Sequence, residues 1–207
     1  MNNDSVDRLA KLFLKFPGIG ERQARRFAYF ILTQQEGYVD SLSRALVAAR
    51  SQANTCQRCL RIFEGQAGVC SICGDEHRDQ GSIVAVEKSQ DIESFNRTDY
   101  NGLFFVLGGL IPIVQKDIVA GTNAQKLIDR VQNESASGLL KEVILAFPIT
   151  PNGEHTDSAV RELLATRSPN SDSAQVTITS LGRGLSTGAE LEYADPASLE
   201  ASLKKRE

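Results

Sequence analysis

The stretch "KFPGIGERQARRF" (residues 15–27) joins two apolar-periodic segments through a Gly-Ile-Gly turn. Before it, residues 5–14 carry apolar side chains at helical spacing, and this helix should end before Pro17. After it, apolar residues recur at helical spacing from Ala24, which predicts a second helix over 21–34. A dinucleotide loop would need a strand before the glycines, and Gln23 stands where that fingerprint has glycine or alanine. The order therefore predicts a helix-hairpin-helix.

The hairpin has the residue types that grip a nucleic-acid backbone. Gly18 and Gly20 allow the main chain to approach a phosphate, and the amides at the start of the second helix would point at it. Arg22, Arg25 and Arg26 follow directly and could contact neighbouring phosphates without reading base sequence. An ordinary helical corner with solvated arginines is the alternative, and the basic cluster favours DNA binding.

The remaining pattern predicts a third helix and then an α/β domain. The helix spans about 38–52, with an inner face made of Val39, Leu42, Ala45, Leu46 and Ala49. Buried strands are predicted at 81–87, 102–107, 142–147 and 175–181, with helices at 89–95, 123–133 and 156–165 and a surface loop at 166–175. Strands that alternate with helices predict a mainly parallel central sheet.

All four cysteines fall in one short segment with the spacing C-x2-C-x10-C-x2-C: Cys56, Cys59, Cys70 and Cys73. Two such knuckles supply the four soft ligands that tetrahedral zinc takes in a closed structural site. Disulfides or a redox-active dithiol are the alternatives, but the chain shows no secretion signal, and paired disulfides are rare in reducing compartments. The spacing predicts one structural zinc ion per chain, with His77 as a nearby residue rather than a ligand.

Composition narrows the class of protein. The chain of 207 residues has a net charge of −3, is 41% hydrophobic, and has no apolar run that approaches the roughly 20 residues of a membrane span. Residues 1–50 carry a net charge of +3, and the remainder carries −6. We therefore expect a cytoplasmic protein whose nucleic-acid contacts lie in the amino-terminal part and whose acidic remainder suits protein partners.

Taken in order, these features resemble the RecR family of bacterial recombination mediators. The resemblance covers nearly the whole chain and depends on the following segments: "FPGIGERQARRFAYFIL" (16–32), the four cysteines, "VAVEKSQDIESFNRTDYNGLFFVLGG" (84–109) and "GRGLSTGAELEYADPASLEASL" (182–203). The stretch "LIPIVQKDIVAGTN" (110–123) and Gln90 depart from the family pattern, which marks a divergent member.

The resemblance implies four parts: a helix-hairpin-helix domain (1–53), a four-cysteine zinc finger (54–79), a Toprim domain (80–180) and a carboxy-terminal region (181–207). It also implies a role in recombinational DNA repair. Family members act with RecO, and in some settings RecF, to help RecA replace single-strand-binding protein, and they commonly assemble into rings that encircle DNA. We accordingly expect a homo-oligomer, either a dimer or a tetramer. It should bind single- or double-stranded DNA and join the nucleoid during repair.

Toprim enzymes place a glutamate after their first strand and an Asp-x-Asp pair after a later one, to hold Mg²⁺. Glu87 occupies the first position, but Pro148 and Ile149 stand where the pair is expected. We therefore predict that the protein is not an enzyme. A metal-dependent phosphodiesterase that uses Glu87 with Glu154 and Asp157 is the alternative. A zinc-stabilised protein-interaction module without a DNA role is a third hypothesis.

Overall fold

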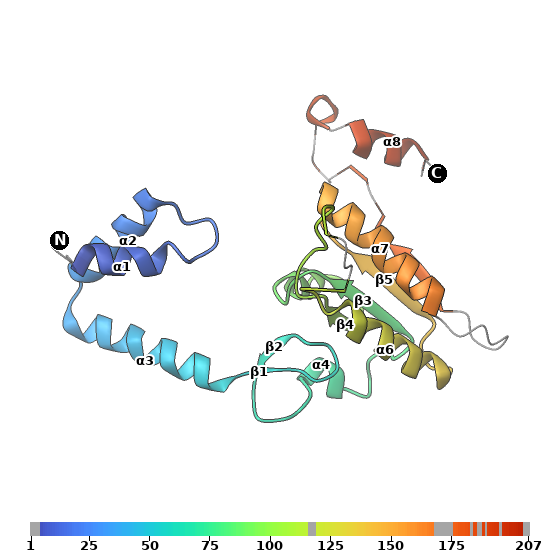
Figure 1. Ribbon diagram of the computed structural model, residues 1–207, viewed down its shortest axis with the longest axis horizontal. Helices are drawn as coiled ribbons and strands as arrows, with labels where there is room; N and C mark the ends of the chain where they lie inside the picture. The colour runs from blue at the N-terminus through green and yellow to red at the C-terminus, as the bar shows by residue number, and fades with distance from the viewer. Residues whose placement is uncertain are drawn as a thin grey trace. The chain divides into compact units, whose positions relative to one another are not determined.

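The computed structural model describes residues 5–115, 119–167, 176–182, 184–185, 188, 190–194 and 196–204. The chain divides into two compact units, Met1–Ala53 and Asn54–Glu207 (Figure 1). The first unit is helical. The second contains the cysteine segment, a parallel sheet and its covering helices.

The first unit contains α1 (Ser5–Phe13), α2 (Glu21–Leu32) and α3 (Glu36–Gln52). Three small side chains, Ala10, Ala24 and Ala28, are buried and allow α1 and α2 to approach closely. The ring of Phe13 meets Phe27 edge to face at a centroid distance of 5.7 Å and closes the end of this small core. The helix-hairpin-helix predicted from the glycine turn is therefore present.

The third helix departs from the prediction in one respect. It exists, but α3 has no buried residue, and of its predicted inner face only Val39 and Leu42 are partly covered. Leu46 and Val47 are 63% and 68% exposed. The expectation of a buried inner face is therefore wrong for the single chain, because α3 does not pack closely on the α1–α2 pair, whose Tyr29, Phe30 and Leu32 also stay about half exposed.

The cysteine segment forms the first part of the second unit. The strands β1 (Ala53–Thr55) and β2 (Ile62–Glu64) pair as a two-stranded sheet around the first Cys-x-x-Cys, and α4 (Ser71–Gly74) carries the second. Main-chain hydrogen bonds fold the first knuckle: Cys56 N–H donates to Arg61 O at 2.9 Å, and Leu60 N–H donates to Cys56 O at 3.0 Å.

The α/β domain has a four-stranded sheet in the order β4-β3-β5-β6, in which every described pairing is parallel. Its strands are β3 (Ser82–Val86), β4 (Leu103–Val106), β5 (Glu142–Ala146) and β6 (Thr177–Ser180). The connecting helices are α5 (Asp91–Phe95), α6 (Ala124–Ala136) and α7 (Pro151–Arg167). This arrangement confirms the predicted α/β class with a parallel sheet.

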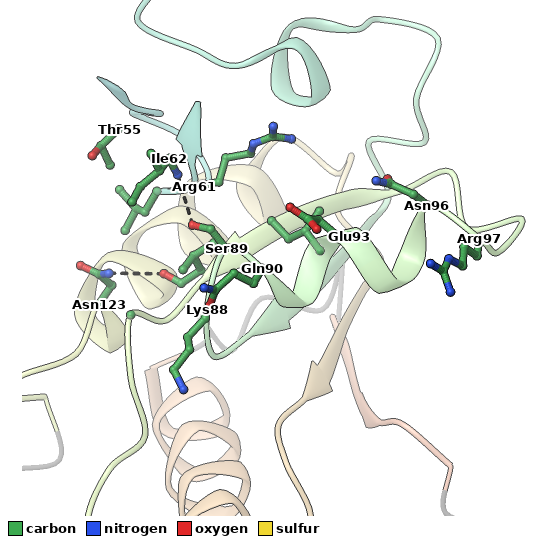
Figure 2. A pocket seen from close by; sticks show the side chains of 14 residues that line it. Thr55, Arg61, Ile62, Lys88, Ser89, Gln90, Glu93, Asn96, Arg97 and Asn123 are labelled. Atoms are coloured by element: carbon green, nitrogen blue, oxygen red, sulfur yellow. Dashed lines mark hydrogen bonds between the residues drawn. The ribbon is translucent and has the colours of Figure 1, made fainter. Parts of the chain in front are cut away.

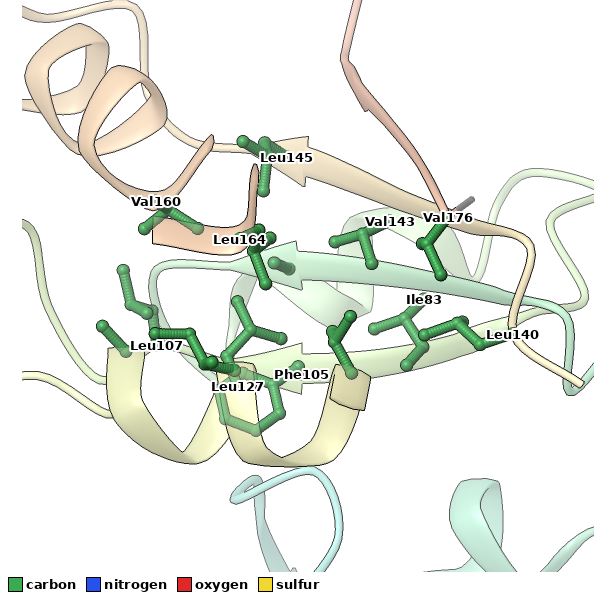
Figure 3. Close-up of a cluster of buried hydrophobic side chains, with 14 of the residues drawn as sticks. Ile83, Phe105, Leu107, Leu127, Leu140, Val143, Leu145, Val160, Leu164 and Val176 are labelled. Carbon is green, nitrogen blue, oxygen red and sulfur yellow. The ribbon is translucent and has the colours of Figure 1, made fainter. Parts of the chain in front are cut away.

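Both faces of the sheet are covered, which explains why β3 and β4 are continuous apolar runs. On one face, α6 and α7 pack Leu127 and Leu164 against Ile83 and Phe105 (Figure 3). On the other face, α5 packs Ile92 against strand residues that include Phe104. Leu60 and Ile72 of the cysteine segment are half-buried against the same core, so this segment is continuous with the α/β domain.

Beyond the sheet the chain forms a 3-10 turn, η1 (Leu191–Tyr193), and a last helix, α8 (Pro196–Lys204). The surface loop predicted for 166–175 lies outside the described residues from 168 on, as does Asp195 of the carboxy-terminal pattern. Within the described part of the chain, no helix has the length and apolarity needed to cross a membrane.

Candidate DNA-binding hairpin and metal centre

The turn between α1 and α2 presents free main-chain donors. Gly18 has a φ of +74°, a left-handed conformation that favours glycine, and both Gly18 and Gly20 are exposed with open space where a side chain would stand. Gly20 is the N-cap of α2 and offers no side-chain cap, and the first helical bond joins Ala24 N–H to Gly20 O at 2.9 Å. The amides of residues 21–23 therefore have no acceptor within the helix. Such an end favours an anion.

The three arginines of α2 differ in their surroundings. Arg25 donates to Asp7 of α1 at 2.9 Å, so it ties the two helices together. Arg26 donates to Gln23 at 3.3 Å and makes no described ion pair. Arg22 is exposed and has no described hydrogen bond or ion pair with a side chain. Arg22 and Arg26, one turn apart, share a face of α2 whose charge is not neutralised.

The four cysteines meet in one buried cluster. Cys56, Cys59, Cys70 and Cys73 are at most 5% exposed, form no disulfide, and have sulfur atoms that all lie within 4.8 Å of one another. The Sγ atoms of Cys59 and Cys70 are 3.6 Å apart. A tetrahedral site with Zn–S bonds of about 2.3 Å requires sulfur atoms about 3.8 Å apart, so the cluster has the dimensions of a four-thiolate zinc site.

Hydrogen bonds within the cluster favour a thiolate at Cys70, whereas the bond to Cys70 raises the pKa of Cys59. The hydrogen bond from Cys59 lowers the pKa of Cys70, and the Cys70 main-chain N–H donates to Cys56 Sγ at 3.3 Å. Such bonds stabilise negatively charged sulfur, the form that binds metal. His77 lies outside the cluster, with a 98% exposed side chain whose Nδ1 is 3.2 Å from Asp75 Oδ1.

The acidic residues considered for Mg²⁺ are not assembled into a site. Glu87 follows β3 and pairs with Lys88 at 2.8 Å. Asp157 lies in α7, where it accepts from Ser180 and pairs with Arg161 at 3.6 Å; Glu154 precedes it in the first turn of the same helix. Within the described part of the chain, the four cysteines are the one group of three or more His, Cys, Asp or Glu side chains placed to hold a metal ion.

A charged network behind the cysteines was not predicted from the sequence. Arg58, between Cys56 and Cys59, donates to Glu134 of α6 at 2.9 Å, and Arg130 donates to the same oxygen at 3.0 Å. Arg130 also donates to the carbonyls of Phe104 and Arg58, and its side chain is 8% exposed. Burial alone would lower the pKa of Arg58, but the bond to Glu134 outweighs it and raises the pKa, so Arg58 stays protonated. A basic residue inside a knuckle was the only sequence signal for it.

The geometry defines a class of protein: a helix-hairpin-helix unit followed by a four-cysteine knuckle pair joined to a parallel α/β domain. A family model described as "RecR, helix-hairpin-helix" matches residues 6–50. Three proteins named "Recombination protein RecR" are similar over nearly the whole chain. That of Levilactobacillus brevis is 34% identical over 204 residues, which are 98% of this chain and 96% of that protein.

The other two are those of Chloroherpeton thalassium, 33% identical over 203 residues (98% of this chain and 96% of that protein), and Ligilactobacillus salivarius, 31% identical over 205 residues (99% and 97%). The chain belongs to the RecR family. The resemblance inferred from the sequence motifs is thereby confirmed.

Proposed function

We propose that this protein is a DNA-binding recombination mediator in recombinational DNA repair. Its relatives are named recombination proteins. The observation that carries the proposal is the hairpin end of α2, where the uncapped amides of 21–23 stand beside the unneutralised charges of Arg22 and Arg26. Main-chain donors and arginines contact phosphate without reading bases, which suits a mediator that must act at any sequence.

Within the hairpin, the roles divide by surroundings. Gly18 and Gly20 bring the main chain to one phosphate, and Arg22 and Arg26 contact its neighbours. Arg25 also faces the DNA side, but its bond to Asp7 makes it the weaker contact, since part of its charge is already neutralised.

The proposal extends to assembly and partners. α3 buries no residue in the single chain, and its exposed Leu46 and Val47 would be covered by a second copy. A dimer or tetramer, arranged as a ring, would hold several hairpins around DNA and act with RecO, and with RecF in some settings, to help load RecA on single-stranded DNA.

The parts would be the hairpin domain (1–53), the zinc finger (54–79), the Toprim domain (80–180) and the carboxy-terminal region (181–207). The place of action would be the cytoplasm.

The metal in the cysteine cluster is proposed to be zinc in a structural role. Four thiolates close the coordination sphere and leave no position for a reacting water. A Mg²⁺-dependent phosphodiesterase is not favoured, because Glu87, Glu154 and Asp157 are not brought together and two of the three are engaged with cations. The protein would therefore act by binding, with Glu87 and Glu154 left as contacts for a partner.

The test is binding of the full chain to fluorescent single- and double-stranded oligonucleotides over a range of salt. Each phosphate contact to a single strand contributes a slope of about −0.7 in log K against log salt, or about fivefold in affinity at 0.1 M salt. Arg22→Ala with Arg26→Ala should therefore weaken binding roughly 25-fold, equally for all base sequences.

The matched control removes two charges from the same unit, by Arg8→Ala on α1 with Arg44→Ala on α3. That variant should bind within about twofold of the parent. Absence of DNA binding at low salt, alone or with RecO, would overturn the proposal. Mg²⁺-dependent nicking that is lost in Glu87→Gln would instead support the enzyme alternative.

A further inference from the structure

A large cleft lies within the second unit, between the first cysteine knuckle and the sheet. It has a volume of about 990 Å³ and is bounded on one side by the knuckle residues Leu60, Arg61 and Ile62. The opposite wall is α5 and the loop before it, with Ser89, Gln90 and Glu93 (Figure 2). The floor includes Val106, the last residue of β4, and Gly108 shortly after it. The cleft thus opens at the carboxyl ends of parallel strands, the edge at which α/β sheets bind ligands.

Cationic side chains line this cleft although the remainder of the chain is acidic. Arg61, Lys88 and Arg97 are cationic and Glu93 is the one carboxylate among the lining residues, so the lining has a net charge of +2. Lys88 is occupied by its 2.8 Å pair with Glu87. Arg61 and Arg97 make no described side-chain hydrogen bond or ion pair. Figure 2 shows them coming from different segments, Arg61 from the knuckle and Arg97 from the turn that follows α5.

The two walls are fixed to each other by hydrogen bonds. Ile62 N–H of the knuckle donates to Ser89 Oγ at 3.2 Å, and Val106 N–H donates to Cys59 O at 2.8 Å. At the floor, Gly108 has a φ of +85°, and a side chain there would stand 2.8 Å from the amide nitrogen of Asn123. The guanidinium groups are therefore carried by a pre-formed frame, which lowers the entropy that a ligand must offset.

We propose that this cleft is a second phosphate-binding site, which takes the backbone of unpaired DNA. Two guanidinium groups without a described partner, carried by different segments of the lining, can each bind a phosphate of the same strand. The volume falls at the upper end of the range for small-molecule sites, so one or two unpaired nucleotides fit inside and a duplex does not. The aliphatic floor has no aromatic platform for base stacking, so the contacts would be independent of base sequence.

The experiment measures affinity of the full chain for a fluorescent single-stranded oligonucleotide between 0.05 and about 0.3 M salt. Arg61→Ala with Arg97→Ala removes two phosphate contacts, so affinity should fall roughly 25-fold at 0.1 M salt and the salt slope should decrease by about 1.4. Glu93→Gln removes the opposing charge and should strengthen binding several-fold. Duplex affinity should stay within about twofold of the parent in both variants.

The matched control is Lys126→Ala with Lys141→Ala, which takes two exposed cations from the same unit outside the cleft. Arg61→Lys with Arg97→Lys keeps the charge and should restore most of the affinity. Thermal melting of each variant shows whether the fold is kept. Equal loss of affinity in the cleft and control variants, or no loss in the cleft variant, would overturn the proposal.

Competition separates the possible sources of phosphate. We expect unlabelled single strands to displace the oligonucleotide. A mononucleotide or pyrophosphate at equal phosphate concentration should not displace it. Tight binding of the mononucleotide alone would mean that the cleft is a nucleotide site, and the strand proposal would be wrong.

The site is independent of the hairpin. If the cleft variant loses DNA binding and the Arg22→Ala/Arg26→Ala variant does not, the hairpin proposal is refuted and the cleft proposal is left intact. The reverse pattern would refute this one alone.

Discussion

At the scale of single residues, the same residue type has different roles within one turn of helix. Arg25 bonds to Asp7 across the hairpin at 2.9 Å, whereas Arg22 has no side-chain partner among the described residues. The sequence placed all three arginines of α2 beside the turn, which the structure also does. The sequence could not distinguish the roles of the three arginines. The partner of Arg25 lies 18 residues earlier, and their contact depends on how α1 packs against α2.

Glu134 is the residue that holds the charged network together. Its Oε1 atom accepts from both Arg58 and Arg130, and the side chains of Glu134 and Arg130 are 20% and 8% exposed. Glu134→Ala would leave the Arg130 charge buried without a carboxylate. We expect it to lower the free energy of unfolding by about 3 kcal/mol, measured by urea denaturation of the metal-loaded protein.

The control for this prediction is Asp129→Ala on the same helix. Asp129 is exposed and accepts a hydrogen bond from Gln125, so its removal should cost about 0.5 kcal/mol or less. Equal loss of stability in the two variants would show that the network contributes nothing beyond a surface contact.

At the scale of elements, folding of the knuckles should depend on the metal proposed for the cysteine cluster. The two Cys-x-x-Cys turns have only three-residue strands and a four-residue helix around them, too little structure to be stable alone. Cys70→Ser should therefore reduce zinc from about one ion per chain to well below one and unfold residues 54–79 locally. Metal analysis with hydrogen exchange checks both, and a full zinc complement in the variant would contradict it.

The elements that the sequence predicted well are those with long, regular patterns. The strands at 82–86 and 103–106 were found because both faces are buried, which leaves continuous apolar runs. The start of α7 was predicted five residues late, at Thr156, because the helix begins at Pro151 with polar residues. The strands β1 and β2 were missed because three residues are too few to show alternation. The basic cleft was missed because its walls come from segments about 30 residues apart.

At the scale of the whole molecule, a single chain leaves apolar surface uncovered on its amino-terminal unit. Besides Leu46 and Val47 of α3, the α2 residues Tyr29, Phe30 and Leu32 are about half exposed. Burial of such a surface between copies would place several hairpins on one DNA molecule, and linked weak contacts gain affinity through effective concentration. In the proposed assembly, the hairpin and the exposed face of α3 would depend on each other for function, although their residues differ.

In that proposed assembly, the exposed face of α3 would be the site at which association can be broken without loss of the fold. Leu46→Glu with Val47→Glu should shift the mass measured by light scattering toward the monomer, because two carboxylates cannot be buried in an apolar interface without a large cost. The helical circular dichroism should be unchanged, since neither side chain is buried in the single chain.

Ser41→Glu with Ala48→Glu, on the other side of α3, is the control and should leave the mass unaltered. An unchanged mass in the first variant would place the interface elsewhere. A decrease in mass accompanied by weaker binding to long oligonucleotides, with Arg22 and Arg26 intact, would show that affinity depends on assembly.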